Sequence, residues 1–189
     1  MVTADLVGAV ADDVEIHECV VERTQLASAR IEGMKVVDTV LDSCDLSGAV
    51  LRDLSLLRVE LRGCRLTGLD LSGAHLRDIT FSNCKLDWAN FRSTTGERVR
   101  FDGCEMTDAD LYAAELDQVD LVDCNLTRVE LSKSTLTGVR LHGSNLDELR
   151  GVRYLNDATI GSTQLVPLAL PLFAELGIRI DDDPDEEIS

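Results

Sequence analysis

The sequence predicts an all-β solenoid, a rod of stacked coils that is followed by a C-terminal helix. The main observation is a large apolar residue at every fifth position from Leu6 to Leu146, with exceptions only at Ala11 and Gly96. Neither a 3.6-residue helical period nor a two-residue strand period keeps such a series on one face, so the chain must turn a corner every five residues. Short fixed repeats of this kind are typical of solenoids, in which each unit packs against its neighbours.

A second inward position accompanies each apolar centre. Two residues before every centre stands Ala, Val, Cys, Thr, Met, Leu, Ile or Ser, and never a charged residue. The charged residues, which make up 28% of the chain, fall on the other three positions of each unit. We therefore expect two residues of every five to line the interior and three to form the outer wall and its corners.

The cysteines indicate how many units make one coil. Five of them recur at intervals of 20 residues, each two places before an apolar centre: Cys44, Cys64, Cys84, Cys104 and Cys124. A coil of four units would stack them in one internal column, with Cys19 on another side. Because the sulfurs of such a column spread along an axis and no CxxC or HxxxH spacing occurs, we expect packing and no metal site.

Several units carry a recognisable motif. Examples are "ADLVG", "CDLSG", "CRLTG", "LDLSG" and "ADLYA", which begin at residues 4, 44, 64, 69 and 109. They are similar to the A(D/N)LXX unit of the pentapeptide-repeat family, over about residues 4 to 149. The resemblance implies a right-handed quadrilateral β-helix with four pentapeptides per coil. We expect residues 1 to 150 to form about seven coils, roughly 35 Å long at the spacing of paired strands.

The "FRSTTGERVRF" segment interrupts the pattern, because the centre at Gly96 carries no side chain while Phe91 and Phe101 keep the register. Two interpretations remain open. The segment forms a pliant site or bulge that a partner uses, or the phenylalanines at 81, 91 and 101 fill the missing volume. The second is favoured, since cores accept rearrangements that conserve volume.

Residues 151 to 180 are predicted to form a C-terminal cap and helix. The five-residue pattern fails at Gly151, Ser162 or Thr163 can cap a helix, and Gly177 can end it. Two prolines, at 167 and 171, predict an interrupted or kinked helix. Residues 181 to 189, "DDDPDEEIS", are expected to be a disordered acidic tail.

The predicted helix is more apolar than one contact with the last coil requires. Its apolar residues form a candidate dimer contact: Leu165, Val166, Leu168, Leu170, Leu172, Phe173 and Leu176. The resemblance to family members that act on topoisomerases, which pair through this end, implies a homodimer. The alternative is a helix that simply tucks under the final coil.

Enzymatic activity is not expected. The three histidines, His17, His75 and His142, occupy outward positions in different coils, and no nucleophile elbow or phosphate-binding glycine loop occurs. We predict no catalytic residue, cofactor or metal. The sequence shows neither a signal peptide pattern nor an apolar stretch long enough for a membrane span, so we expect reduced thiols and a cytoplasmic protein.

The net charge of −17 at pH 7 favours a basic partner and opposes direct binding to nucleic acid. The resemblance extends to pentapeptide-repeat proteins that mimic DNA and occupy the DNA-binding saddle of DNA gyrase, a type II topoisomerase. Such proteins protect gyrase from quinolones or inhibit it. The resemblance therefore implies a non-enzymatic DNA mimic, and the alternative is a scaffold or interaction module with an unknown protein partner.

Acidic residues concentrate between residues 101 and 127, where no Lys or Arg occurs, and one stripe runs along the axis. The candidate acidic partner face consists of Asp70, Asp102, Glu105, Asp108, Asp110, Glu115, Asp117, Asp120, Asp123 and Glu130. Other outward columns neutralise themselves, as in the series Glu18, Asp38, Arg58, Asp78 and Arg98, and in Asp42 beneath Arg62. A scaffold would use outward apolar residues instead: Val20, Val37, Val40, Leu57 and Trp88.

Overall fold

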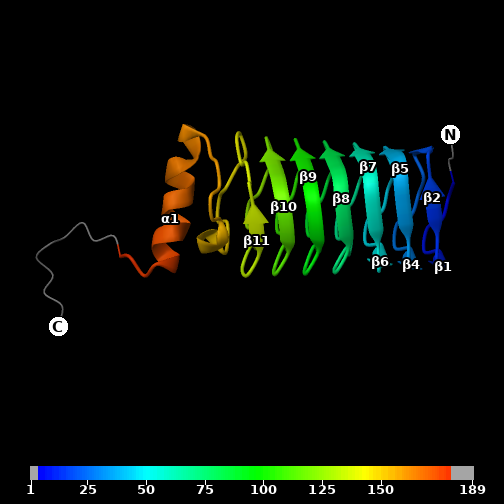
Figure 1. Cartoon of the computed structure of the whole chain (residues 1–189), viewed down its shortest axis with the longest axis horizontal. Helices are drawn as coiled ribbons and strands as arrows, with labels where there is room; N and C mark the ends of the chain where they lie inside the picture. The colour runs from blue at the N-terminus through cyan, green and yellow to red at the C-terminus, as the bar shows by residue number, and fades with distance from the viewer. Residues whose placement is uncertain (1–3, 180–189) are drawn as a thin grey trace, which may run out of the picture.

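The structure, a computed structural model, describes residues 4–179 as a rod of stacked coils that ends in a helix (Figure 1). The predicted tail, residues 181 to 189, lies outside the described residues. Short strands alternate with corners along the whole rod. They are β1 (Val10–Asp12), β2 (Glu15–His17), β3 (Val20–Glu22), β4 (Arg30–Glu32), β5 (Lys35–Asp42), β6 (Val50–Arg52), β7 (Ser55–Arg62), β8 (His75–Ser82), β9 (Thr95–Asp102), β10 (Glu115–Val122) and β11 (Thr135–Thr137).

Every strand pairing is parallel and joins residues of successive coils. One sheet has the order β1-β4-β6, and the other follows β11-β10-β9-β8-β7-β5-β2, with β3 also beside β5. Val10 pairs with Arg30 and Glu115 with Thr135, so the register advances by one coil of 20 residues. The six pairings along the longer path make a parallel β-solenoid of about six turns, close to the seven predicted.

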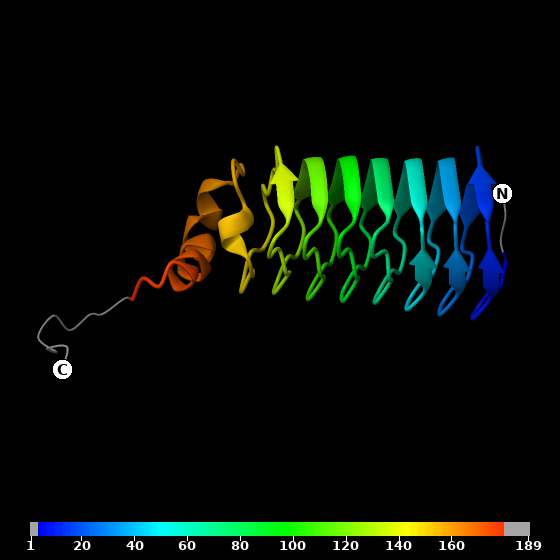
Figure 2. The ribbon, with the colours of Figure 1, turned by 60° about the horizontal axis from the view of Figure 1, so that its bottom comes forward.

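Four ladders of parallel pairs run along the rod, and they give it four sides. Figure 2 shows the coils stacked side by side along the axis. Isolated bridges from Asp5 through Gln25 and Asp45 form one ladder, and those from Val50 through Asp70 extend a second. The two halves of the long strands, such as β7 and β8, form the third and fourth. At the corners, outward residues adopt a positive φ, which for Trp88 is 60°. This left-handed conformation turns the chain from one side to the next.

The interior is filled by the two inward positions of each unit, as predicted. Leu66 and Leu86 are fully buried centres, whereas Leu6, in the first described coil, is 44% exposed because no described coil covers it. The missing side chain at Gly96 leaves no cavity that could accept one. A Cβ there would lie 2.9 Å from both the Leu76 carbonyl oxygen and Leu116 Cδ2.

The phenylalanine cluster supports the volume-filling interpretation of Gly96. Phe81 stacks on Phe101 with ring centroids 4.8 Å apart, and Phe91 meets Phe101 edge to face at 5.7 Å. All three rings are buried. The segment around Gly96 remains a regular part of β9, which pairs with strands on both sides.

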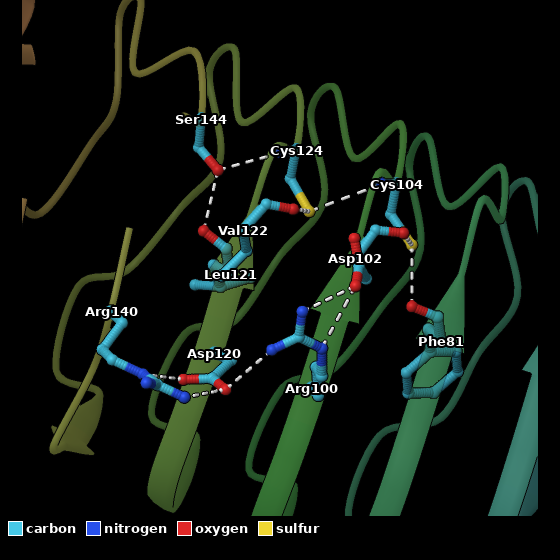
Figure 3. Close-up of polar contacts among 10 residues, drawn as sticks. All are labelled: Phe81, Arg100, Asp102, Cys104, Asp120, Leu121, Val122, Cys124, Arg140 and Ser144. Atoms are coloured by element: carbon cyan, nitrogen blue, oxygen red, sulfur yellow. Dashed lines mark hydrogen bonds and ion pairs between the residues drawn. The ribbon is translucent and has the colours of Figure 1, made fainter. Parts of the chain in front are cut away.

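The cysteine column exists as predicted, and hydrogen bonds join it to the wall (Figure 3). All five thiols are free and buried, whereas Cys19 is half-buried. Four of the thiols donate to a carbonyl of the preceding coil, as Cys84 Sγ does to Leu61 at 3.4 Å and Cys104 Sγ to Phe81 at 3.3 Å, whereas Cys124 Sγ donates to the Val122 carbonyl at 3.2 Å. Contact with neighbouring thiols, followed by burial, raises the pKa of Cys84, which disfavours the reactive thiolate.

The same column continues into the C-terminal cap. Ser144 Oγ donates to the Leu121 carbonyl at 2.7 Å, and one coil later Gln164 Nε2 donates to the Leu141 carbonyl at 2.5 Å. Gln164 Oε1 also accepts the N–H of Gly161 at 2.7 Å. This buried amide therefore satisfies backbone groups that another coil would otherwise pair.

The cap contains two 3-10 turns, η1 (Val152–Tyr154) and η2 (Ser162–Gln164), followed by the helix α1 (Leu165–Glu175). Gly151 has a φ of 74°, and a Cβ there would lie 2.4 Å from the Ser132 nitrogen, so only glycine fits where the coil pattern ends.

The expected cap of the helix was wrong. Ser162 and Thr163 do not cap α1, because they lie in η2, whose N-cap is Gly161. Of the two predicted effects of the prolines, an interruption does not occur, since α1 continues through Pro171. Its predicted end at Gly177 is confirmed: Gly177 has a φ of 71°, and the Ile178 N–H donates to the Phe173 carbonyl at 2.9 Å.

Candidate protein-interaction surface

The ten predicted acidic residues do not form one face. Glu105, Asp110, Glu115 and Asp120 each belong to a different ladder, so the acids occupy all four sides of the rod. The reason is geometric, because an interval of five residues moves the chain to the next side. The predicted stripe is real, since bridges connect Asp70 through Asn90 to Asp110 and then to Glu130.

Arginines neutralise four of these acids, three of them from neighbouring coils and Asp102 from its own strand, so the prediction that they are unbalanced was wrong for them. Arg128 donates two hydrogen bonds to Asp108, at 2.9 and 2.7 Å, and Arg92 contacts Asp110 at 2.7 Å. The sequence segment 101–127 lacks basic residues, but the coil places residues about 20 positions away beside it. Hydrogen bonds from Arg128 hold the pKa of Asp108 below its ordinary value.

The other two neutralised acids belong to a network on a different side of the rod (Figure 3). Arg100 lies between Asp102, at 2.6 Å, and Asp120, at 3.1 Å. Arg140 forms a two-pronged ion pair with the same Asp120. Hydrogen bonds from Arg140 lower the pKa of Asp120, although its burial acts in the opposite direction.

The six remaining acids differ in how accessible they are. Asp70 accepts hydrogen bonds from the Asn90 side chain and the Ser72 N–H, and Glu130 accepts one from the Ser132 N–H. The other four are exposed and have no ion pair with any residue in the range 4–179: Glu105, Glu115, Asp117 and Asp123. These four are the carboxylates that a basic partner could reach.

The predicted charge ladders are confirmed in part. Arg58 contacts Asp38 at 2.5 Å and Arg98 pairs with Asp78, each across one coil. Asp42 and Arg62 are register partners, as expected, but the Arg62 guanidinium pairs with Glu60 of its own strand at 2.5 Å. Such exposed pairs contribute little to stability, because solvent screens the charges.

The sequence analysis missed a hollow of about 440 Å³ on the side that carries the Asp110 ladder. It is lined by Trp88, Arg92, Asp108, Asp110, Tyr112, Arg128, Glu130, Ser132 and Arg150. The missed signal was the 20-residue period of the outward positions, which sets Trp88, Asp108 and Arg128 in one column. A search for acidic residues alone could not find a site that combines aromatic and basic groups.

Comparison with known families and structures identifies the architecture. A model described as "Pentapeptide repeat region" matches residues 14–91 and 80–150. The chain belongs to the pentapeptide-repeat family. A search of curated proteins found no match.

A solved structure shows the same fold at low sequence identity. A trypsin-treated form of QnrB1, a plasmid-mediated fluoroquinolone resistance protein, is 19% identical, with a TM-score of 0.52, over 95% of this chain and 98% of QnrB1. HetL from the cyanobacterium Nostoc sp., involved in heterocyst differentiation regulation, is 21% identical, with a TM-score of 0.32, over 78% of this chain and 83% of HetL.

Beyond the pentapeptide repeats, α1 exposes most of the predicted dimer contact. Leu168 and Leu172 pack against the core, but none of the helix residues is buried. On its other sides Leu165, Val166 and Leu170 are between 56% and 71% exposed, and Phe173 and Leu176 are exposed as well. One face of the helix thus covers the last coil, and the rest is an apolar surface.

The outward apolar residues near the N-terminal end of the repeats form two adjacent register pairs. Val20 pairs with Val40, and Val37 pairs with Leu57, as the column arrangement predicted. Val20 is exposed and the other three are half-buried. Trp88 lies apart from them, at a corner farther along the rod, and is 65% exposed.

The histidines do not assemble a polar site. His75 Nδ1 contacts Thr95 Oγ1 at 2.7 Å, and His17 lies 3.5 Å from Glu15, on the rod surface. Among residues 4–179, no cluster of His, Cys, Asp and Glu is arranged to hold a metal ion. None of the described helices has the length and apolar character needed to cross a membrane.

Proposed function

We propose that this protein is a non-enzymatic, protein-binding rod that mimics DNA and binds DNA gyrase, modulating it or protecting it from quinolones. The observation that carries the proposal is a rod with exposed carboxylates on its sides and a net charge of −17. A DNA-binding saddle is lined with cations that neutralise phosphates, and a rod of the same charge sign competes for them. The fold likeness to a fluoroquinolone resistance protein supports the choice of target.

The binding groups in this proposal are Glu105, Glu115, Asp117 and Asp123, the exposed acids without an ion pair. Asp102, Asp108, Asp110 and Asp120 are already neutralised by arginines, so they add little to the attraction. Glu115 and Asp117 lie on one strand, β10, and their side chains are exposed. A basic saddle that closes on this part of the rod would neutralise them without breaking an existing pair.

A gyrase supercoiling assay, with and without a fluoroquinolone, tests the proposal. We expect the purified protein to change supercoiling or drug sensitivity, and a triple variant, Glu115→Lys, Asp117→Lys and Asp123→Lys, to lose the effect. The matched control is Asp12→Lys, Asp13→Lys and Glu32→Lys, which makes the same charge change on exposed residues of the first coils.

The comparison of these two variants separates a local surface from overall charge. Loss of the effect only in the variant of Glu115, Asp117 and Asp123 supports the proposed surface. Equal loss in both variants indicates that the effect depends on net charge alone. Binding should also weaken as salt rises, since exposed charges are screened within about 10 Å at 0.1 M. No effect of the parent protein at micromolar concentration in either assay would refute the gyrase proposal.

We further propose that the protein is a cytoplasmic homodimer that pairs through α1. The support is the apolar surface of Leu165, Val166 and Leu170, which a second copy would cover. Val166→Glu with Leu170→Glu should give a monomer by analytical ultracentrifugation. The control is Val7→Glu with Val10→Glu, which alters exposed apolar residues at the other end of the rod. A parent that sediments as a monomer would contradict the proposal.

A scaffold with another protein partner is the second candidate. The observation that favours it is the apolar group of Val20, Val37, Val40 and Leu57 on two adjacent sides of the rod. Such a scaffold would tolerate the charge reversals and high salt, because its contact is hydrophobic. It would lose its partner when Val20 and Leu57 become serine.

A further inference from the structure

The first coil leaves an open strand edge at the N-terminal end of the rod (Figure 1). β1 and β2 each pair with a later coil on one side, and no described strand lies on their other side. In the second coil the Arg30 N–H donates to the Ala9 carbonyl of the first, at 2.8 Å. Val10 occupies the same repeat position as Arg30, one coil earlier, and Glu15 does so on the next side. Within residues 4–179, no preceding coil supplies a carbonyl for their N–H groups.

The carbonyl groups of this edge are open as well. The Glu32 carbonyl accepts the Asp13 N–H from the coil before it, at 2.9 Å. Asp12 occupies the same repeat position as Glu32, one coil earlier, and His17 is the equivalent residue on the next side. Residues 9–18, which we call the N-terminal edge, therefore present both donors and acceptors along the axis. Such an edge pairs readily with an added extended segment.

The interior behind the N-terminal edge is apolar and incompletely covered. Ala11 is one of the two small centres of the repeat, whereas the centres stacked beyond it are Ile31 and Leu51. Ala11 and Ile16 are half-buried, because no described coil covers them. A large apolar side chain placed over Ala11 would continue the column of large centres and remove apolar surface from water.

The rim of the N-terminal edge is acidic. Residues 4–22 contain no Lys or Arg, and four exposed acids lie along the edge: Asp12, Asp13, Glu15 and Glu18. Glu15 contacts Lys35 of the second coil at 3.6 Å and His17 at 3.5 Å. The other three acids form no ion pair with any residue in the range 4–179. Three exposed carboxylates are therefore accessible to a basic partner.

We infer that the N-terminal edge binds an extended segment of a partner protein in which large apolar residues alternate with basic ones. The segment adds in parallel, as every described pairing of the rod does. Its apolar side chains lie over Ala11 and Ile16, and its Lys or Arg side chains reach Asp12, Asp13 and Glu18. Backbone hydrogen bonds supply affinity, and the two kinds of side chain supply selectivity.

Charge also decides against one other occupant of the N-terminal edge. A second copy of this chain that joined through the same end would bring its own acidic first coil against these carboxylates, and like charges oppose that contact. The edge lies at the opposite end of the rod from α1 (Figure 1). It does not include the acids of β10, so the inference is independent of the gyrase proposal.

The test uses a fluorescent synthetic peptide in which the unit Ala-Lys-Ile-Lys-Gly occurs twice, so that it matches a half coil over residues 9–18. Fluorescence anisotropy measures its binding to the full-length protein. We expect saturable binding that weakens about tenfold in the variant Asp12→Asn, Asp13→Asn and Glu18→Gln. The matched control is Glu115→Gln, Asp117→Asn and Asp123→Asn, which removes three exposed carboxylates from another coil and should bind the peptide like the parent.

Methylation of single peptide nitrogens separates strand addition from simple charge attraction. In the rod the N–H of a centre donates to the following coil, as Leu51 does to the Asp70 carbonyl at 3.0 Å. The residue before a centre donates to the preceding coil, as Asp70 does to the Ala49 carbonyl at 2.9 Å. A parallel peptide therefore directs its Ile N–H groups at the protein and the N–H groups of the preceding Lys residues away from it. N-methylation of both Ile residues should weaken binding about tenfold, and N-methylation of those Lys residues should leave it unchanged.

Four outcomes would overturn the inference. Absence of saturable binding to the parent would show that the N-terminal edge is closed to an added strand. Equal binding of the peptide methylated at Ile would leave charge attraction alone, and equal binding of a peptide with Ser in place of Ile would exclude contact with the interior. Release of a smaller species when the peptide is added, measured by analytical ultracentrifugation, would assign the edge to a second copy of this chain.

Discussion

At the scale of single residues, the same repeat position has different roles along the rod. Leu66 and Leu6 are both apolar centres, but Leu66 is fully buried and Leu6 is 44% exposed. The difference arises because a centre is covered only by the coils on its two sides, and Leu6 has a described coil on one side only. The repeat pattern identifies which side chains point inward, and the position of the coil along the rod decides how deeply each of them is buried.

This difference predicts the effect of placing a charge in the core. Leu66→Asp should lower the free energy of unfolding by about 5 kcal/mol or more, because a carboxylate replaces a buried leucine without a partner. Leu6→Asp, at the equivalent position of the first coil, should cost less than about 1 kcal/mol. Urea denaturation measures both. A Leu66→Asp variant as stable as the Leu6→Asp variant would contradict the inward assignment.

The cysteines should divide into two classes by reactivity. Cys19 is half-buried, and the other five thiols are buried in the column. Contact with neighbouring thiols, and then burial, also raises the pKa of Cys84 and Cys124, which disfavours the thiolate at these two positions. We expect a maleimide to label at most Cys19 in the native protein and all six thiols in urea, as measured by mass spectrometry. Rapid native labelling of Cys84 would refute this prediction, and a Cys19→Ser variant serves as the control.

At the scale of elements, buried side chains close the C-terminal end of the wall. They make the hydrogen bonds that a further coil would otherwise make. Gln164 donates to the carbonyls of Leu141 and Ser144, at 2.5 and 2.7 Å, and is almost completely buried. Removal of a buried donor leaves the acceptors without water or a partner. The last coil therefore depends on one amide as well as on the apolar contacts of α1.

Gln164→Ala should consequently lower the free energy of unfolding by about 1 to 3 kcal/mol. Gln164→Glu should be at least as destabilising, because a carboxylate cannot donate to the two carbonyls. The matched control is Gln118→Ala, an exposed glutamine at a corner. Thermal unfolding followed by circular dichroism gives the comparison, and a Gln164→Ala variant that melts like the control would show that the cap does not rely on the amide.

The ladders of ion pairs make the stability of the folded protein depend on pH. Arginine partners hold the pKa of Asp38, Asp78 and Asp108 below the ordinary value. A carboxyl group with a lowered pKa in the folded state stabilises the protein above its unfolded pKa of about 4, and this contribution disappears as pH falls through the folded value.

We therefore expect the melting temperature to fall between pH 5 and pH 2 and to be nearly constant from pH 5 to pH 7. Asp108→Asn should reduce this fall in melting temperature, because the variant lacks one of the carboxyl groups whose pKa is lowered by folding. Asp123→Asn, which changes an exposed acid without an ion pair, should leave it unchanged. A melting temperature that rises on acidification would contradict the role of these pairs.

At the scale of the whole molecule, the two ends of the solenoid are not equivalent. The last coil is closed by Val152, Gln164 and α1, while the first described coil exposes Leu6 and leaves Ile16 half-buried. In a solenoid each coil is stabilised mainly by its neighbours, so an uncovered coil opens most easily.

Hydrogen exchange should show this asymmetry. Amides of residues 5–22 should exchange at least about tenfold faster than those of residues 84–129, and the last coil, 130–149, should be nearly as protected as the centre. Mass spectrometry of peptides from the exchanged protein resolves these segments. Uniform protection along the rod would indicate that something covers the first coil or that all coils open together.

The sequence alone determined the architecture, because its signal is periodic and local. The apolar centres specified which residues face inward, and the interval between Cys44 and Cys64 specified the length of a coil. The end of the helix at Gly177 was also readable, since a left-handed C-cap requires glycine. Its start was not, because the N-cap residue is Gln164, whose side chain makes no capping bond to the helix and donates instead to the carbonyls of Leu141 and Ser144.

Only the tertiary structure decided how the outward charges combine. The acids between residues 101 and 127 seemed unpaired along the chain, but coiling brings Arg128 to Asp108 and Arg92 to Asp110. The same stacking sets Trp88 beside these pairs and creates a hollow lined by aromatic, basic and acidic side chains. Ion pairing depends on the distance in space between the charged groups of long side chains. The repeat specifies where each backbone position lies, but it does not specify which neighbouring carboxylate a guanidinium contacts.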